Sequence, residues 1–446
     1  MQKKNNKIFE IDDTVAVSNL TECKYSTVIT KIAEEKNHLY NDFKYQIITL
    51  ITIFLFASAF IFNTPSEIVE GMKAILVSPS TLVTDYFLIS NIGSALFNSA
   101  VITFVGIFLA RVNKVEMNGA LMAALFTLAG FSFFGKNLYN TWGVLAGVYL
   151  YSKFRNEAFN RYLIMGLFST ALGPLISCIT FGLNLNIYLG FIIGNLAGVI
   201  AGFVIPPLSC HFLIFHKGFS LYNIGFTAGI VGMFFMAVLR GLGYEIESTV
   251  RVITGMNRPL GIFLSMLFLL LLLTGIVQSR FKIKEIKLLL KKTGKLPTDF
   301  MSDTSIGIIL INMSLLGFMS MAYVILLGGN FNGPVIGGIF TVVGFGAYGK
   351  HIKNVVPIFI GVYLASIFNV YDAGSTSALL AALFGTTLAP VAGHFGPLYG
   401  IIAGFFHMSM TMNVSYLHGG MNLYNNGFSG GFVAAALVPL FNALRK

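Results

Sequence analysis

The chain has 446 residues, of which 55% are hydrophobic and only 11% are charged, and its net charge is +11. Soluble domains carry about 25% charged residues, so this composition excludes an ordinary soluble protein and predicts an all-α, polytopic protein whose surroundings are the lipid bilayer. The positive residues are concentrated in loops and in the first 44 residues. In a membrane protein this pattern indicates orientation, not binding to nucleic acid.

Apolar segments follow one another after a polar N-terminal segment at 1–43. They fall at 44–63, 92–110, 118–134, 143–153, 162–181, 188–215 and 219–239, and then at 258–280, 304–328, 332–348, 355–368, 376–392, 396–416 and 422–441. A span needs about 20 apolar residues, so we expect the short segments 143–153 and 355–368 to be half-helices or re-entrant pieces. The stretch 65–87 is too polar to cross and is expected at the interface, with the basic stretch 280–295 as its counterpart.

The two halves of the chain repeat one another. A shift of 214 residues superposes Asn118-Gly119 on Asn332-Gly333, Gly135-Lys136 on Gly349-Lys350, Asn140 on Asn354, and Gly147-Val-Tyr-Leu150 on Gly361-Val-Tyr-Leu364. A shift of 202 superposes Leu221-Tyr222-Asn223-x-Gly225-Phe226 on Leu423-Tyr424-Asn425-x-Gly427-Phe428. The difference of 12 predicts an insertion in the first copy around 182–189. We therefore predict two membrane repeats, at 44–257 and 258–446, an arrangement typical of transporters and channels.

Seven hydrophobic segments per half, an odd number, would turn the second copy upside down. The expected inner segments contain lysine or arginine, and they are 111–117, 153–161, 216–218, 280–295 and the C-terminus with Arg445 and Lys446. The outer connections contain neither, and they are 182–187, 329–331, 369–375 and 417–421, while the loop 240–258 is an exception. The positive-inside rule therefore predicts two inverted repeats in the cell (inner) membrane, with both termini cytoplasmic. Counting the short segments as re-entrant hairpins would change this result.

The repeated Tyr-Asn-x-Gly-Phe blocks are the first candidate site. Glycines four residues apart share a helix face and allow another backbone to approach, so a helix-packing face is one interpretation. Asparagine and tyrosine are costly to bury without a partner or a solute, so a pore lining is the other. The candidate lining residues are Tyr222, Asn223, Gly225, Phe226, Tyr424, Asn425, Gly427 and Phe428.

Two lysines recur at equivalent break points, Lys136 and Lys350, and each is followed by an asparagine, Asn140 or Asn354. Ionisable residues inside a span are functional candidates. Lysines near span ends also extend to the lipid headgroups, which is the alternative interpretation. If the two lysines instead converge on the path, an anionic solute becomes the better expectation.

No cofactor, metal site or enzymatic motif is expected. His216 and His418 recur in loops, and a cluster of His394, His407, Met408, Met410, Met412 and His418 invites a soft-metal site. Methionine more often serves as adaptable packing, and three cysteines without a CxxC pair indicate neither zinc nor a disulfide framework. No span contains an evident buried carboxylate, which favours a passive or neutral-solute path over a proton- or sodium-driven carrier.

The repeated blocks resemble elements of urea transporters. Their inverted halves each carry a Gly-rich Tyr-Asn element, similar to the blocks above, and an Asn-Pro-rich element, similar to Lys353-Asn354-Val-Val-Pro357. The first half departs from this pattern, with Trp142-Gly143 where the second has Val356-Pro357. This resemblance covers about 40 residues per half and implies a urea-like neutral solute and a trimer. Over nearly its whole length the chain also resembles a bacterial family of uncharacterised duplicated membrane proteins, which implies no substrate.

We therefore expect a channel or transporter for a small polar solute, with the path between two inverted repeats and a urea-like solute favoured. The alternative is a secondary transporter for a small ion, with Lys136 and Lys350 contacting an anion. An intramembrane enzyme or sensor that uses His407 and His418 is a further alternative, although a site with two copies of one lining argues against an enzyme. A homo-oligomer is compatible with each of these.

Overall fold

The computed structural model describes residues 39–80, 84–246, 250–279, 283–423 and 425–445. These residues form helices and two isolated β-bridges, and they contain no strands. The chain divides into the units Met1–Ile47 and Ile48–Lys446, and every contact described below lies within the second unit. Both predicted repeats, apart from residues 44–47, fall inside that one unit. The polar segment 1–43 lies outside the described residues up to residue 38.

Helices occupy most of the predicted segments of the first half. After the helix Leu39–Phe62 they are α2 (Pro65–Val77), α3 (Tyr86–Ile89), α4 (Ile92–Val112), α5 (Gly119–Phe131), α6 (Trp142–Phe154), α7 (Asn160–Ser169), the 3-10 turn η1 (Thr170–Leu172), α8 (Gly173–Ser177), the π-helical turn η2 (Cys178–Gly182), α9 (Ile187–Phe215) and α10 (Asn223–Gly241). The stretch 65–87, expected at the interface, contains α2 and the start of α3 and is only partly described.

The second half repeats this order. Its helices are α11 (Asn257–Ser279), α12 (Ile283–Leu289), α13 (Ile306–Leu326), α14 (Gly333–Gly344), η3 (Phe345–Ala347), α15 (Ile352–Phe368), α16 (Thr376–Gly385), η4 (Thr386–Leu388), α17 (Ala389–Phe395), α18 (Pro397–His418) and α19 (Asn425–Leu444). Within the described residues, nine helices are long and apolar enough to cross a membrane. The protein is therefore a multi-pass, all-helical membrane protein.

Two helices are shorter than the sequence indicated. The segments 118–134 and 332–348 were expected to cross, but α5 has 13 residues and α14 has 12, which is about 20 Å at 1.5 Å per residue. A bilayer core is about 30 Å thick, so neither helix spans it alone. The expected short segment 143–153 is the 13-residue α6, whereas 355–368 is part of the longer, 17-residue α15.

Side-chain amides satisfy the backbone where α5 and α14 end. Asn98 of α4 donates from Nδ2 to the carbonyl oxygens of Ser132 (2.8 Å) and Lys136 (2.9 Å). Between these carbonyls the chain turns at Gly135, whose φ of 74° favours glycine. The equivalent residues of the second half are Asn312, Gly346 and Lys350. A break at membrane depth requires such internal partners, because lipid offers none.

The segments 162–181 and 376–392, expected as single spans, are interrupted helices. In each, an α-helix passes through a 3-10 turn, η1 or η4, before a proline at the second position of the next helix. Proline lacks the N–H that an unbroken helix needs, so the interruption follows from Pro174 and Pro390. The insertion predicted near 182–189 corresponds to η2, the loop after it and a longer α9, which has 29 residues against 22 in α18.

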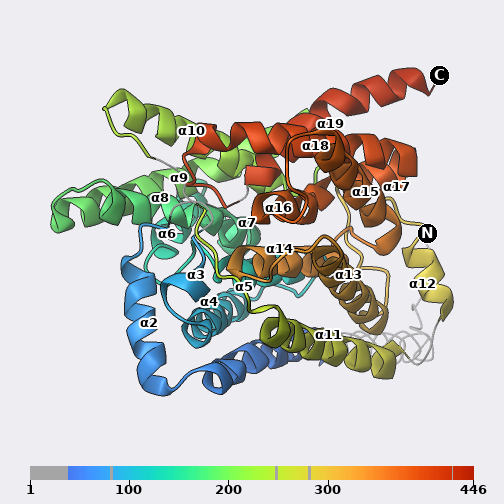
Figure 1. Cartoon of the computed structure of the whole chain (residues 1–446), viewed down its shortest axis with the longest axis horizontal. Helices are drawn as coiled ribbons and strands as arrows, with labels where there is room; N and C mark the ends of the chain where they lie inside the picture. The colour runs from blue at the N-terminus through green and yellow to red at the C-terminus, as the bar shows by residue number, and fades with distance from the viewer. Residues whose placement is uncertain (1–38, 81–83, 247–249, 280–282, 424, 446) are drawn as a thin grey trace, which may run out of the picture. The chain divides into compact units, whose positions relative to one another are not determined.

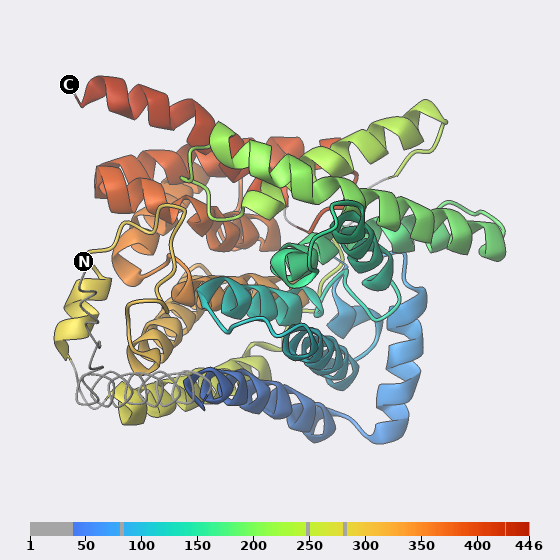
Figure 2. The same ribbon diagram turned by 180° about the vertical axis from the view of Figure 1, so that it is seen from behind.

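Helices of the two halves pack against each other at the centre of the unit Ile48–Lys446. The short helices α5 and α14 lie side by side, and α10 packs against α19 (Figure 1). The view from behind shows the same two pairs (Figure 2). In each pair a phenylalanine meets its own repeat equivalent, with ring centroids 6.0 Å apart for Phe126 and Phe340 and 6.1 Å for Phe226 and Phe428.

Reciprocal contacts also join the halves. Asp85 of the first half accepts a hydrogen bond from the backbone N–H of Gly333, the first residue of α14, at 3.1 Å. Asp299, which lies 214 residues after Asp85, accepts from the N–H of Gly119, the first residue of α5, at 3.1 Å. A contact that recurs with the two halves exchanged is the mark of a two-fold relation. The halves are therefore related by a pseudo-two-fold axis between α5 and α14.

Candidate functional site

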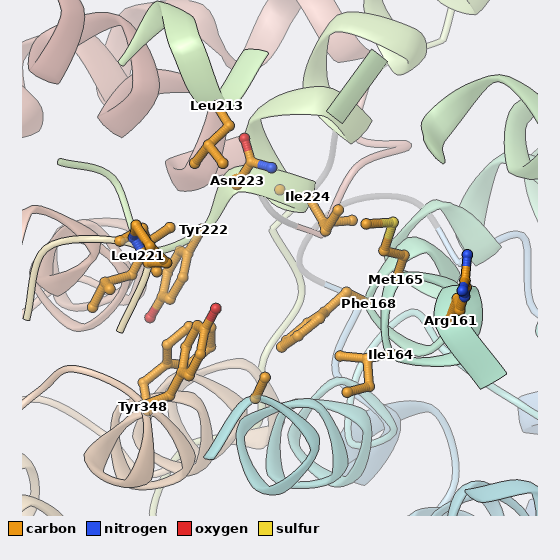
Figure 3. Close-up of a pocket in the computed structure, with 15 residues that line it drawn as sticks. Arg161, Ile164, Met165, Phe168, Leu213, Leu221, Tyr222, Asn223, Ile224 and Tyr348 are labelled. Atoms are coloured by element: carbon orange, nitrogen blue, oxygen red, sulfur yellow. The ribbon is translucent and has the colours of Figure 1, made fainter. Parts of the chain in front are cut away.

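A cavity of about 320 Å³ lies beside the start of α10, and we name it the first cavity. Tyr222 and Tyr348 lie on one side of it, and Ile164, Met165 and Phe168 of α7 lie on the other (Figure 3). Its other lining residues are Ala120, Arg161, Leu213, Leu221, Asn223, Ile224, Gly225, Leu296, Pro297 and Phe345. Both halves contribute to the wall, so the cavity exists only where they meet.

A smaller cavity of about 110 Å³, the second cavity, lies beside the start of α19. Its lining includes the repeat equivalents of residues in the first cavity. The pairs, first cavity then second, are Tyr348 and Phe134, Phe168 and Phe384, Ile164 and Leu380, Arg161 and Ser377, Leu213 and Ser415, Leu221 and Leu423, Asn223 and Asn425, and Ile224 and Asn426. The pseudo-two-fold axis therefore relates the two cavities.

Rings in edge-to-face and tilted contact lie between the two cavities, and we name them the aromatic partition: Tyr222, Phe345, Phe168, Phe384 and Phe131. Tyr222 in the wall of the first cavity packs on Phe384 in the wall of the second, with centroids 6.3 Å apart. Phe168 and Phe345 are 5.8 Å apart, as are their equivalents Phe384 and Phe131. Buried rings that line the first cavity thus contact buried rings that line the second.

Lys350 lies inside this partition. Its side chain is fully buried, and Nζ donates to the Tyr222 hydroxyl at 2.5 Å and to Thr386 Oγ1 at 2.6 Å. The same nitrogen is 4.5 Å from the centre of the Tyr222 ring and 5.0 Å from that of Phe345, within the range of a cation–π contact. Lys350 therefore lies directly behind Tyr222 and Phe345, two residues of the first cavity's wall.

Lys136 occupies the equivalent place in the other half. Its side chain is 1% exposed. Its Nζ donates to Thr170 Oγ1 at 2.6 Å and lies 5.4 Å from the centre of the Phe131 ring. Neither lysine forms an ion pair with any residue that the structure describes. Such burial is incompatible with extension to the headgroups, so the alternative of an interfacial lysine does not fit the structure.

The asparagines have different roles. Asn223 lines the first cavity. Its Oδ1 lies 3.0 Å from Nε2 of His216, and its Nδ2 donates to the carbonyl oxygen of Ser209. Asn425 lines the second cavity. Asn140 and Asn354 line neither cavity. They donate to the carbonyls of Gly135 and Gly349 and accept a backbone N–H, of Asn137 and His351, so they fix the turns before the buried lysines.

The remaining candidates form the contact between α10 and α19. A Cβ on Gly427 would lie 3.0 Å from the backbone of Gly225, and Phe226 and Phe428 are buried. Of these four residues, Gly225 lines the first cavity, and the other three are outside the described lining of both named cavities. This part of the repeated block thus packs helices together, as the alternative interpretation expected. Tyr424 lies outside the described residues.

His216, His351 and His407 form hydrogen bonds with the protein, whereas His418 is buried and packs edge-on against the Phe428 ring. His407 is buried and lies 3.1 Å from Asn426 Oδ1, and His351 caps α15. In the part of the chain that the structure describes, no three histidine, cysteine, aspartate or glutamate side chains form a group that could hold a metal ion. The arrangement at the interface is therefore a pair of cavities with amine and amide groups beside them.

Three pairs of residues at this interface were not singled out from the sequence: Asp85 and Asp299, Asn98 and Asn312, and Thr170 and Thr386. The first two pairs obey the same 214-residue shift as the lysines, so extending the repeat toward the N-terminus would have found them. The threonines belong to a third block, Leu-Phe-x-Thr-x-Leu-x-Pro, in which the shift is 216.

Burial raises the pKa of the Asp85 carboxyl to about 6, although hydrogen bonds from three backbone N–H groups act in the opposite direction and lower it.

A family model matches the chain over residues 64–241 and 278–443, which together are most of its length. The chain belongs to the family described as "Protein of unknown function (DUF1576)". Its two matched regions agree with an internal duplication and confirm the resemblance to a family of duplicated membrane proteins. No curated protein and no solved structure matches the chain. The comparisons thus do not show the resemblance to urea transporters.

Proposed function

We propose that this protein is a transporter of a small polar solute across the cell (inner) membrane, with the path running through the two cavities and the partition between them. The observation that carries the proposal is that Tyr222 of one cavity wall packs on Phe384 of the other. Cavities related by a two-fold axis and separated by a thin layer are what two inverted repeats would form around a central binding region.

In this proposal the first cavity opens to the cytoplasm and the second to the outside. Arg161 borders the first cavity, and Leu296 in its wall directly follows the basic stretch 280–295. The second cavity has no charged residue in its described lining. The positive-inside rule favours this orientation, with both termini cytoplasmic.

A carrier fits better than an open channel. The rings of the partition are buried and in contact, so a solute passes only if the two halves rearrange. Alternating access by movement of one repeat against the other provides such a step. A urea-like neutral solute is the first candidate, through the amide groups of Asn223 and Asn425, and the two buried lysines favour an anion as the second.

Thiol accessibility tests the path. In a background in which Cys23, Cys178 and Cys210 are serine, Ile164→Cys should react with a membrane-impermeant thiol reagent only from the cytoplasmic face. Ser377→Cys should react only from the outer face. Phe406→Cys, on a 51% exposed side chain of α18 that we expect to face lipid, is the control and should react from neither. Reaction of both cavity positions from one face would overturn the proposal.

Flux through proteoliposomes then tests the transport itself. The panel comprises urea-like amides, ammonium, small inorganic anions and organic monocarboxylates including benzoate, and the double variant Asn223→Ala plus Asn425→Ala is compared with the wild type. We expect flux of one class and at least a tenfold loss in the variant. Flux of no solute, or flux that the double substitution leaves unchanged, contradicts the proposal.

A further inference from the structure

The first cavity is larger and more apolar than a urea-sized solute requires. Its volume of about 320 Å³ lies at the lower end of the range of about 300–1,000 Å³ that pockets for drug-sized molecules occupy. Most of its wall is hydrocarbon, with Ile164, Met165 and Phe168 facing Tyr222 and Tyr348 (Figure 3). Apolar walls gain free energy from covering an apolar surface, so the occupant that fits has a hydrophobic body.

A basic group lies behind one part of this wall. The Tyr222 hydroxyl accepts a hydrogen bond from Lys350 Nζ, which no described carboxylate pairs. Burial without a counter-charge disfavours the protonated form of the Lys350 amine, and an anion bound beside Tyr222 would supply the counter-charge that favours that form. Arg161 at the edge of the cavity is already paired with Glu157, at 3.2 Å.

From these two features, and resting on the proposed function, we infer that the transported solute is an organic anion with a single carboxylate and a small apolar body. The carboxylate lies toward Tyr222 and Lys350, and the apolar body lies against α7. Lys350 acts through the Tyr222 hydroxyl and is thus a positioning residue. The second cavity presents Phe384 and Leu380 in the same arrangement, with Lys136 behind the partition.

The helix N-termini at this interface do not compete for the anion. The N-termini of α5 and α14 favour negative charge, but Asp299 and Asp85 already accept hydrogen bonds from their first N–H groups. The lysines are therefore the basic groups left for a solute. One amine per cavity favours one negative charge, so a monocarboxylate fits better than a dianion.

Equilibrium binding of benzoate and benzamide tests this inference, because the two probes share a ring and differ in charge. Calorimetry of the purified full chain in nanodiscs at pH 7 should show benzoate binding at least tenfold more tightly. Lys350→Gln should weaken benzoate binding at least tenfold and leave benzamide unchanged. Lys353→Gln removes an exposed lysine three residues later and is the matched control, with no change expected.

Equal affinity for the two probes, or benzoate binding that Lys350→Gln does not weaken, overturns the inference. If that variant does not fold, Tyr222→Phe replaces it and should lower the preference for benzoate at least threefold. The measurement needs no transport. Cavities that open to opposite faces without benzoate binding would refute the substrate class alone, whereas lysine-dependent binding without flux would refute the proposed function alone.

Discussion

At the scale of single residues, buried polar groups hold the interface of the two halves together. Asp85 is fully buried, and it accepts backbone N–H groups from Phe87, Ile253 and Gly333. Burial penalises its charged form, whereas these hydrogen bonds favour it. Burial is the larger effect and raises the pKa of Asp85 to about 6 from an ordinary value of 3.8.

This shift predicts how stability depends on pH. A group whose pKa is higher in the folded than in the unfolded protein adds to stability as the pH falls, here from about 6 to about 4. Asp85→Asn cannot titrate, so over that window the stability of the wild type should rise relative to the variant, by up to about 3 kcal/mol. Thermal unfolding in detergent from pH 4 to 7.5 measures the difference.

The control for this prediction is Asp303→Asn. The Asp303 carboxyl is exposed, and a hydrogen bond from Lys292 lowers its pKa. A lowered pKa adds stability that is lost as the pH falls, so any change should be small and of opposite sign. Parallel curves for the wild type and Asp85→Asn would show that the Asp85 carboxyl does not titrate in this window.

At the scale of helices, glycines set how closely the two halves approach. A Cβ on Gly229 of α10 would lie 2.6 Å from Phe428 Cβ of α19, and a Cβ on Gly431 would lie 2.2 Å from the Phe226 ring. No such carbon fits without moving a helix. The spacing of the repeated glycines thus has a structural reason, which is close contact of α10 with α19.

Two glycines one turn apart provide a matched test of this contact. Gly229→Ala should destabilise the protein by about 1–3 kcal/mol, because the added carbon overpacks the interface. At Gly232 the nearest atoms would be 3.5 Å away, an ordinary contact, so Gly232→Ala should be neutral or stabilise by up to about 1 kcal/mol. Thermal unfolding of both variants measures the difference, and a Gly229→Ala variant as stable as the wild type would show that the α10–α19 contact tolerates a methyl group.

Much of the helical framework was predictable, because long apolar runs and repeated motifs are local signals. The ends of α5 and α14 were not, since their apolar character continues past Phe131 and Gly344 and the chain turns only at the glycine that follows. The burial of Lys136 was also beyond the sequence. A lysine near a span end has the same neighbours in the chain whether it extends to the headgroups or lies beneath aromatic rings, and only tertiary packing decides.

At the scale of the whole molecule, the two-fold relation constrains the topology. Asn156 and Asp372 occupy equivalent loops, 216 residues apart, and both are exposed. If the axis lies in the membrane plane, these loops lie on opposite sides of the bilayer. If it is perpendicular to the membrane, they lie on the same side.

Labelling in cells distinguishes the two cases. We expect Asn156→Cys to react with an impermeant thiol reagent only after permeabilisation, because its loop carries Arg155 and Arg161 and is expected inside. Asp372→Cys should react in intact cells. A cysteine-free parent protein is the control for background labelling, and reaction of both positions under the same condition would exclude inverted repeats.

The exchanged carboxylates have a consequence for how this protein is made. During synthesis α5 is made long before Asp299, which accepts a hydrogen bond from its first residue. By contrast, Asp85 is already present when α14, whose first residue it accepts from, is made. Asn118 caps α5 within the first half, but the first N–H of that helix lacks its carboxylate until Asp299 is made, and neither half supplied alone holds both hydrogen bonds. Newly inserted chains should depend on chaperoning or stay exposed to proteolysis until the ribosome has passed residue 299.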